Sequence, residues 1–166
     1  MESKWVWTIV LVALSAAVYG GTVLATPATG FTSATLAKAQ FVDLKVRARS
    51  LPAQWQAKIK TKGLSDLYVQ SNVWTPGGSS GWHTHPGPSL IMVTVGTVTV
   101  YDGDDPTSTP HTYSANGANG FVDVGGGEVH TVRNESTEEA RAVVVQFLPA
   151  GSVRRIDAPA PGNCPF

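Results

Sequence analysis

Apolar and polar residues alternate along much of the chain after residue 41. In FVDLKVRA (residues 41–48) every second residue is aliphatic and charged residues lie between them, and QWQAKIKTKG (54–63) repeats this alternation. A period of two is typical of a β-strand with one buried face. Similar short runs follow, namely DLYVQSNVW, SLIMVTVG, TVTVYDGD, GFVDVG, EVHTVRN and ARAVVVQFL.

Clusters rich in Gly, Pro, Ser and Asn separate most of these runs, for example TPGGSSG and VGGGE. Short strands at this spacing, with almost no helical periodicity, predict an all-β sandwich or small barrel. A chain of 166 residues has room for one domain with a real core. We therefore expect a single barrel domain over residues 41–157.

The first 25 residues have a different composition from the rest. One lysine precedes an apolar run from Trp5 to Tyr19, and small residues including Val23 and Ala25 follow. This order is typical of a secretory signal peptide. An uncleaved membrane-anchor helix is the alternative, because residues 5–25 could just span a bilayer of about 30 Å. We expect export, to the periplasm, the medium or a membrane-anchored position outside the cytoplasm.

Two further segments flank the predicted barrel. Residues 26–40, rich in Thr and Ala, are expected to be a linker or short arm with a weak helical tendency near residues 35–40, and residues 158–166 form a Pro-rich tail. The single cysteine, Cys164, cannot close an intrachain disulfide, so it is either a tolerated thiol or a link between chains. A homodimer is compatible with the sequence.

The charge balance argues against a nucleic-acid partner. Twelve basic and twelve acidic residues cancel, and charged residues make up only 14% of the chain. Phosphate binding normally needs a basic face. We therefore expect a small-molecule substrate or ligand, with membrane contact only if the N-terminal segment is retained.

Three histidines carry the main functional signal. His83 and His85 lie one residue apart in GWHTHPGPSL, so a strand would project both imidazoles from one face. His130 lies in a second Gly-rich turn that runs into another strand. If the two strands face each other across a barrel, three neutral imidazoles offer a site for a divalent transition metal.

This spacing resembles the first motif of the cupin superfamily, written G-x5-H-x-H-x3,4-E-x6-G. Gly77, His83, His85 and Gly96 match, and Ser89 stands where the glutamate would be. The resemblance, which spans about residues 65–153, implies a jelly-roll β-barrel.

The second cupin motif, G-x5-P-x-G-x2-H-x3-N, is also present in part. Gly127, His130 and Asn134 match, Gly125 replaces the proline, and Gly120 is one residue out of place. Two separated motifs that agree in spacing and order make the resemblance specific.

The resemblance implies that His83, His85 and His130 bind one metal ion, with Fe(II) expected first and Mn, Ni or Zn as alternatives. Ser89 is a poor ligand, so the site is similar to the three-histidine sites of thiol and diketone-cleaving dioxygenases. Without a carboxylate the ion would keep its full charge and favour an anionic, chelating substrate.

Two functions follow from this resemblance. The first is a non-haem, metal-dependent oxidoreductase of the dioxygenase type, with no catalytic acid or base assigned. The second is a non-catalytic module that binds a metal or small ligand outside the cytoplasm. Open coordination positions at the metal would favour the enzyme.

Strand parity suggests which other residues line the pocket. Ser89 shares the inward face with the histidine pair, Glu128 and Asn134 share parity with His130, and Gln70 lies on the strand entering the first motif. Glu128 is the one carboxylate that parity places near the metal, although a solvated turn position is the interpretation we favour for it. His111 lies outside both motifs and is expected on the surface.

Overall fold

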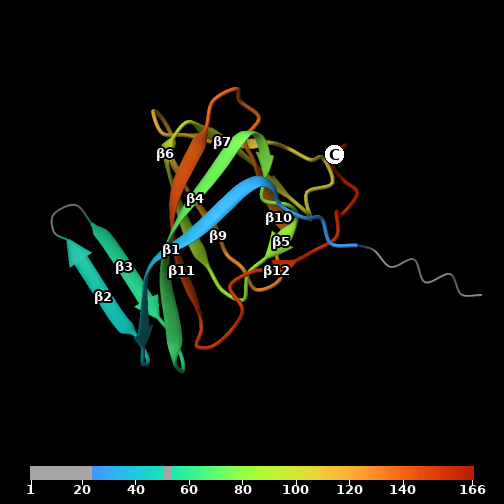
Figure 1. Cartoon of the computed structure of the whole chain (residues 1–166). Helices are drawn as coiled ribbons and strands as arrows, with labels where there is room; N and C mark the ends of the chain where they lie inside the picture. Colours follow the sequence, from blue (N-terminus) through green and yellow to red (C-terminus); the bar gives the residue numbers. More distant parts are fainter. Residues whose placement is uncertain (1–23, 51–53) are drawn as a thin grey trace, which may run out of the picture.

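The computed structural model describes residues 24–50 and 54–166, and every regular element in this part of the chain is a β-strand (Figure 1). The predicted all-β class is therefore confirmed for these residues, which contain no helix able to cross a membrane. Nearly all of the predicted N-terminal apolar helix lies outside the described residues. The strands are β1 (Thr29–Phe41), β2 (Lys45–Ser50), β3 (Trp55–Lys60), β4 (Ser65–Ser79), β5 (His83–Thr84), β6 (Ser89–Val95), β7 (Thr97–Asp102), β8 (His111–Ser114), β9 (Gly120–Asp123), β10 (His130–Arg133), β11 (Ala140–Pro149) and β12 (Ile156–Asp157).

Ten of these strands form one antiparallel sheet that curls into a jelly-roll-like barrel (Figure 1). Its main path runs β12-β5-β10-β4-β11-β6-β9, with β1 paired to β4, and β7 paired to both β10 and β8. The 15-residue strand β4 is the central strand of the fold, because it pairs with β1, β11 and the end of β10.

The core follows from strict alternation along the central strands. In β6, Ser89, Ile91 and Val93 are buried while Leu90 and Met92 face outward, and β11 alternates in the same way. The apolar part of the interior is built from Trp74, Ile91, Val93, Val98, Val100, Val132, Ala140, Ala142 and Val144. The rest of the interior contains a second small apolar cluster around Trp82 and Tyr101 and a group of buried polar side chains, several of which form the candidate site.

The segment expected to be a linker or arm is instead mostly strand β1. It pairs antiparallel with β4 from Phe41 opposite Ser65 to Phe31 opposite Trp74. Phe31 packs on Trp74 with ring centroids 5.0 Å apart. The Thr- and Ala-rich composition resembles a linker, but the exposed edge of β4 supplies hydrogen-bond partners that make an extended strand favourable.

Strands β2 and β3 form a hairpin that projects from the barrel as a separate two-stranded sheet (Figure 1). This hairpin was expected to belong to the barrel domain. Val46 pairs with Ile59 across the hairpin, and Trp55, near the turn, is 57% exposed. The opposite face carries only basic or neutral polar side chains, from Lys45, Arg47, Arg49, Gln56, Lys58 and Lys60.

The two ends of the described chain meet beside the barrel. The Thr26 amide donates to the Ala158 carbonyl at 3.1 Å, and its hydroxyl accepts from the Trp82 amide at 2.8 Å. The C-terminal tail lies against the barrel, where Cys164 packs on a small cluster that includes Trp82 and Tyr101. Cys164 is a free, partly buried thiol.

Candidate metal centre

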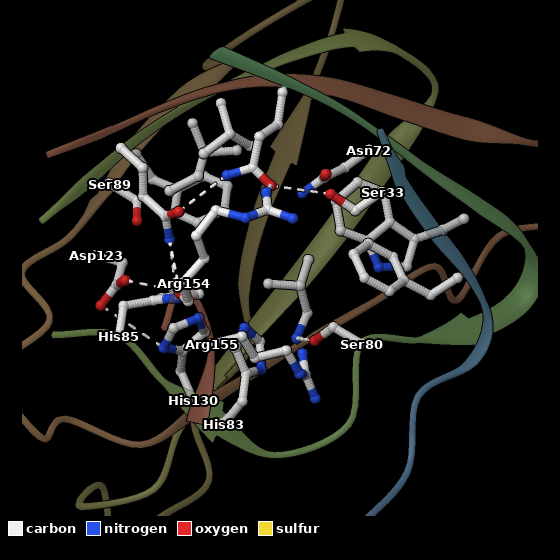
Figure 2. A pocket seen from close by; sticks show the side chains of 18 residues that line it. Ser33, Asn72, Ser80, His83, His85, Ser89, Asp123, His130, Arg154 and Arg155 are labelled. Carbon is white, nitrogen blue, oxygen red and sulfur yellow. Dashed lines mark hydrogen bonds and ion pairs between the residues drawn. The ribbon is translucent and has the colours of Figure 1, made fainter. Parts of the chain in front are cut away.

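The three histidines of the two motifs converge at one end of the barrel interior (Figure 2). His83 on β5 lies directly opposite His130 on β10 in the antiparallel register, and His85 follows β5. Strands β5 and β10 are therefore hydrogen-bonded neighbours in the sheet, whereas we expected them to face each other across the barrel. The ring centroids are 4.4 Å apart for His83 and His130, 4.8 Å for His83 and His85, and 5.5 Å for His85 and His130.

Backbone carbonyls orient two of the three rings. His83 Nδ1 donates to the Gly81 carbonyl at 2.8 Å, so its Nε2 presents a lone pair, which is the form that binds a metal. His85 Nδ1 lies 2.6 Å from the Arg154 carbonyl, an acceptor, and 2.8 Å from the Gln146 amide nitrogen, a donor. These two contacts hold the His85 ring, and each tautomer satisfies one of them.

The site keeps the three imidazoles neutral. Burial is the largest cause that lowers the pKa of His83, His85 and His130 below the ordinary value for histidine. For His83 the neighbouring His130 and the Arg155 guanidinium lower the pKa further. Neutral imidazole is the ligand form, so the site suits a divalent metal at neutral pH.

A carboxylate that the sequence motifs do not mark lies beside the histidines. Asp123, the last residue of β9, places Oδ2 3.7 Å from His85 Nε2 and Oδ1 3.7 Å from His130 Nδ1. The expected three-histidine cluster is present, and Asp123 is an additional neighbour that the motifs did not predict. Alternation in GFVD could have placed Asp123 on one face, but the pattern alone does not show that this face points to the histidines.

Ser89, expected from parity, and Gln70, expected from its place on the strand before the first motif, both lie in the cavity wall. Figure 2 labels Ser89. Ser89 is 2% exposed and lies opposite Asp123 in the register of β6 and β9. Gln70 accepts a hydrogen bond from Arg154 Nη1 at 2.6 Å and donates one to Gln146 Oε1 at 2.9 Å. Gln70 thereby orients an arginine, and Ser89 faces the histidines.

Two other predicted pocket residues lie elsewhere. Glu128 is exposed in the turn before β10 and lines a separate surface hollow, in agreement with the solvated interpretation. Asn134 is fully buried, but its amide donates to the backbone carbonyls of Glu138 at 2.7 Å and Trp74 at 3.1 Å. Asn134 is thus a structural residue. His111 is exposed on β8, as expected for the surface.

The histidines open into a cavity of about 120 Å³ inside the barrel. Arg154 and Arg155, from the segment between β11 and β12, contribute its basic groups, and Figure 2 shows their guanidinium groups on different sides of the cavity. Sequence reasoning missed both arginines, because they lie outside the two motifs. The apolar part of the wall comes from Phe31, Trp74, Ile91, Phe121, Val132 and Val144.

Unpartnered polar atoms concentrate in this cavity. Among the described residues, eight buried side-chain nitrogen or oxygen atoms have no hydrogen-bond partner, and five of the eight belong to residues of the cavity wall. These five are Asn72 Oδ1, Trp74 Nε1, Ser89 Oγ, Asp123 Oδ2 and Arg155 Nη2. Buried polar groups normally find a partner, so these atoms call for an ion, a ligand or water in the cavity.

No protein-family model and no curated protein matches the sequence. Solved structures match in fold, and one is the polyketide cyclase RemF from Streptomyces resistomycificus, at 17% identity and a TM-score of 0.50, over 81% of this chain and 77% of that chain. A cupin_2 domain of an XRE family transcriptional regulator from Enterobacter cloacae matches at 14% identity and a TM-score of 0.45, over 73% and 99% of the two chains. A cupin superfamily protein from Desulfitobacterium hafniense matches at 8% identity and a TM-score of 0.41, over 69% and 81%.

Proposed function

We propose that this chain is a non-haem metal-dependent oxidoreductase of the dioxygenase type. The proposal takes as its premise the cupin fold that the two histidine motifs predicted. The observation that carries this proposal is the convergence of three neutral imidazoles on a buried cavity with unpartnered polar atoms. Fe(II) is the proposed ion, with Mn, Ni or Zn as alternatives. Such an ion supplies Lewis-acid and oxygen-activating chemistry when bound.

The arginines of the cavity wall support an anionic substrate. Among the described residues, no carboxylate lies within ion-pair distance of the Arg154 guanidinium, which bonds the neutral Gln70 amide at 2.6 Å. Arg155 pairs with Asp157 through Nε, but its Nη2 is buried without a partner. Because Asp123 offsets part of the metal charge, the preference for an anion now rests on these arginines.

The cavity volume limits the substrate to a small molecule. Its 120 Å³ is slightly less than the roughly 150 Å³ of an engineered cavity that takes up benzene. A compact carboxylate with a second oxygen donor would reach both the histidines and a guanidinium group. We therefore propose small hydroxy- or oxo-carboxylates as the substrate class.

Export belongs to the same proposal. The apolar run and the small residues at Val23 and Ala25 support removal of residues 1–25 or their use as an anchor. N-terminal sequencing of protein from the producing cell should give Thr26 for the cleaved form. A chain that begins at Met1 in a soluble cytoplasmic fraction would contradict both forms.

The decisive experiment combines metal analysis with oxygen uptake. Protein purified without added metal is analysed for bound metals, loaded anaerobically with Fe(II), and screened with small hydroxy- and oxo-carboxylates beside their neutral amides. We expect oxygen uptake with an acid and not with its amide. Arg154→Gln should raise KM for the acid about 10- to 100-fold, because a charged hydrogen bond is lost.

His130→Ala is the control, because it removes one of the three metal ligands and should abolish oxygen uptake. A protein that binds the metal and the acids but consumes no oxygen with any of them would be the non-catalytic binding module instead.

A further inference from the structure

We propose that Asp123 is a fourth protein ligand of this metal site and takes the place of the glutamate that is absent at Ser89. The inference rests on the proposed metal site and concerns a residue outside both histidine motifs. Ser89 and Asp123 are directly opposite each other on the antiparallel strands β6 and β9. Side chains in such pairs project from the same face with Cβ atoms about 4.5–5.5 Å apart. The Asp123 carboxylate therefore lies one strand away from the motif position of the glutamate and faces the histidines.

The contacts of Asp123 call for a cation. Its side chain is 5% exposed, and Oδ2 has no hydrogen-bond partner although it lies 3.7 Å from His85 Nε2. His85 Nδ1 lies between the Arg154 carbonyl and the Gln146 amide nitrogen, and in the tautomer with hydrogen on Nδ1 the ring presents its Nε2 lone pair to Oδ2. A positive ion between Nε2 and Oδ2 would bind both atoms and balance the charge of the buried carboxylate.

The separation also fits two ligands of one ion. Ligand atoms at about 2.0–2.2 Å from a metal lie roughly 3–4 Å apart, depending on the coordination geometry. Oδ2 of Asp123 is 3.7 Å from His85 Nε2, and Oδ1 is 3.7 Å from His130 Nδ1. Figure 2 shows the carboxylate directed at both rings. The ligand atoms of the three histidines lie within 4.8 Å of one another, and Asp123 approaches two of the three rings.

The glycine that replaces the proline of the second cupin motif supports a role for Asp123. This glycine is Gly125, and its N–H donates to Asp123 Oδ1 at 2.9 Å. Proline has no N–H and cannot adopt the positive φ of +67° found at Gly125. A Cβ at this position would lie 2.3 Å from the Gly87 carbonyl oxygen. Glycine is thus required here, and its N–H orients the carboxylate of Asp123.

The first test compares two carboxylate-to-amide changes in the full-length protein. Asp123→Asn removes the proposed ligand, and Glu128→Gln is the matched control in the exposed turn before β10. Co(II) and Mn(II) are titrated into metal-free protein, with Co(II) absorption as the second readout. We expect Asp123→Asn to weaken binding by about 100-fold or more and to change the Co(II) spectrum, because loss of groups that only orient a ligand already costs about 10–100-fold. Glu128→Gln should bind as the parent does.

The second test moves the carboxylate back to its motif position. Asp123→Ser alone should weaken Co(II) binding as Asp123→Asn does. Combining it with Ser89→Glu should restore affinity, because the glutamate reaches the ion from the neighbouring strand. If Asp123 only positioned His130 from outside the coordination sphere, Ser89→Glu would not restore the affinity for the ion. Circular dichroism of the metal-free variants checks that each one folds.

The outcomes separate this inference from the proposed function. If Asp123→Asn binds Co(II) with the affinity and spectrum of the parent while His130→Ala does not bind, the fourth ligand is refuted and the three-histidine site stands. If both single Asp123 variants lose the ion and the double variant does not recover it, Asp123 is a positioning residue and not a ligand. If the parent itself binds no divalent ion, both proposals fail.

Discussion

Strands β6 and β3 both place apolar side chains on one face but differ completely in the burial of that face. In β6, Ile91 and Val93 lie in the core, whereas in β3 the corresponding apolar residues Trp55 and Ile59 are 57% and 43% exposed. β6 is paired on both sides, by β11 and β9, whereas β3 pairs only with β2. Alternation therefore determines which side chains share a face. Whether that face is buried depends on the strands that other parts of the chain supply.

The hairpin is also the less stable of the two regions on physical grounds. Lys45 faces Lys60 and Arg47 faces Lys58 across the strands, and like charges in directly opposite positions are destabilising. An isolated two-stranded hairpin is marginally stable at best in water. The barrel, in contrast, gathers its apolar side chains in one buried cluster. Substitutions in the two regions should therefore have very different effects.

The largest expected effect is loss of the metal when a barrel histidine is removed. His83→Ala should lower metal retention more than any other change, because it removes one of the three imidazoles whose ligand atoms lie within 4.8 Å of one another. Trp55→Ala in the hairpin should leave the metal content unchanged. Metal analysis after dialysis measures both. Retention of metal by the variant that replaces all three histidines with alanine would refute the site.

A second comparison uses two tryptophans. Trp74 is 2% exposed in the core and Trp55 is 57% exposed in the hairpin. Trp74→Ala should lower the free energy of unfolding by about 3–5 kcal/mol. Trp55→Ala should lower it by less than about 1 kcal/mol, as for most surface changes. Urea unfolding measures both free energies. Equal losses of unfolding free energy in the two variants would mean that the apolar face of the hairpin is covered in solution.

Acid should weaken the attachment of β1 to the barrel. Asp66 on β4 accepts from the Gly151 amide at 3.0 Å and lies 3.0 Å from Lys38 Nζ of β1. These contacts lower the pKa of Asp66 to about 2, from an ordinary value of 3.8. Since the pKa is lower in the folded state, the stabilisation is complete above about pH 4 and is lost as the pH falls towards 2.

Asp66→Asn should therefore reduce the change in unfolding free energy between about pH 5 and pH 2, measured by urea unfolding. Lys38→Gln should reduce it less, because the Gly151 amide still bonds the carboxylate. An unchanged pH dependence in Asp66→Asn would contradict the assignment.

The smallest expected effect is that of Ser89→Ala. A neutral hydroxyl is a weak ligand, so this variant should retain the metal and change at most the affinity for a substrate analogue. Metal analysis and analogue binding test both points. Loss of metal from Ser89→Ala would mean that its hydroxyl, and not only Asp123, coordinates the ion.

Much of the barrel was predictable from the sequence, because alternation and Gly-rich turns are local signals. The two motifs likewise brought His83, His85 and His130 together correctly. The role of residues 26–40 was missed, since small and polar residues form a strand only when an edge such as β4 is free. Asp123, Arg154 and Arg155 were missed for a related reason: their inward position depends on pairing between distant strands, which no local pattern contains.

The docking of Thr26 has a consequence for the timing of export. Thr26 is bonded to Ala158 and Trp82, and it directly follows Ala25, where the leader is proposed to be cut. A peptidase needs an extended and accessible chain at its cleavage point, and the folded barrel holds this stretch against its own C-terminal segment. If residues 1–25 are a cleaved leader, as proposed, cleavage has to precede the closing of this contact. The relative speed of the two events would then set the fraction of molecules that stay attached to their leader.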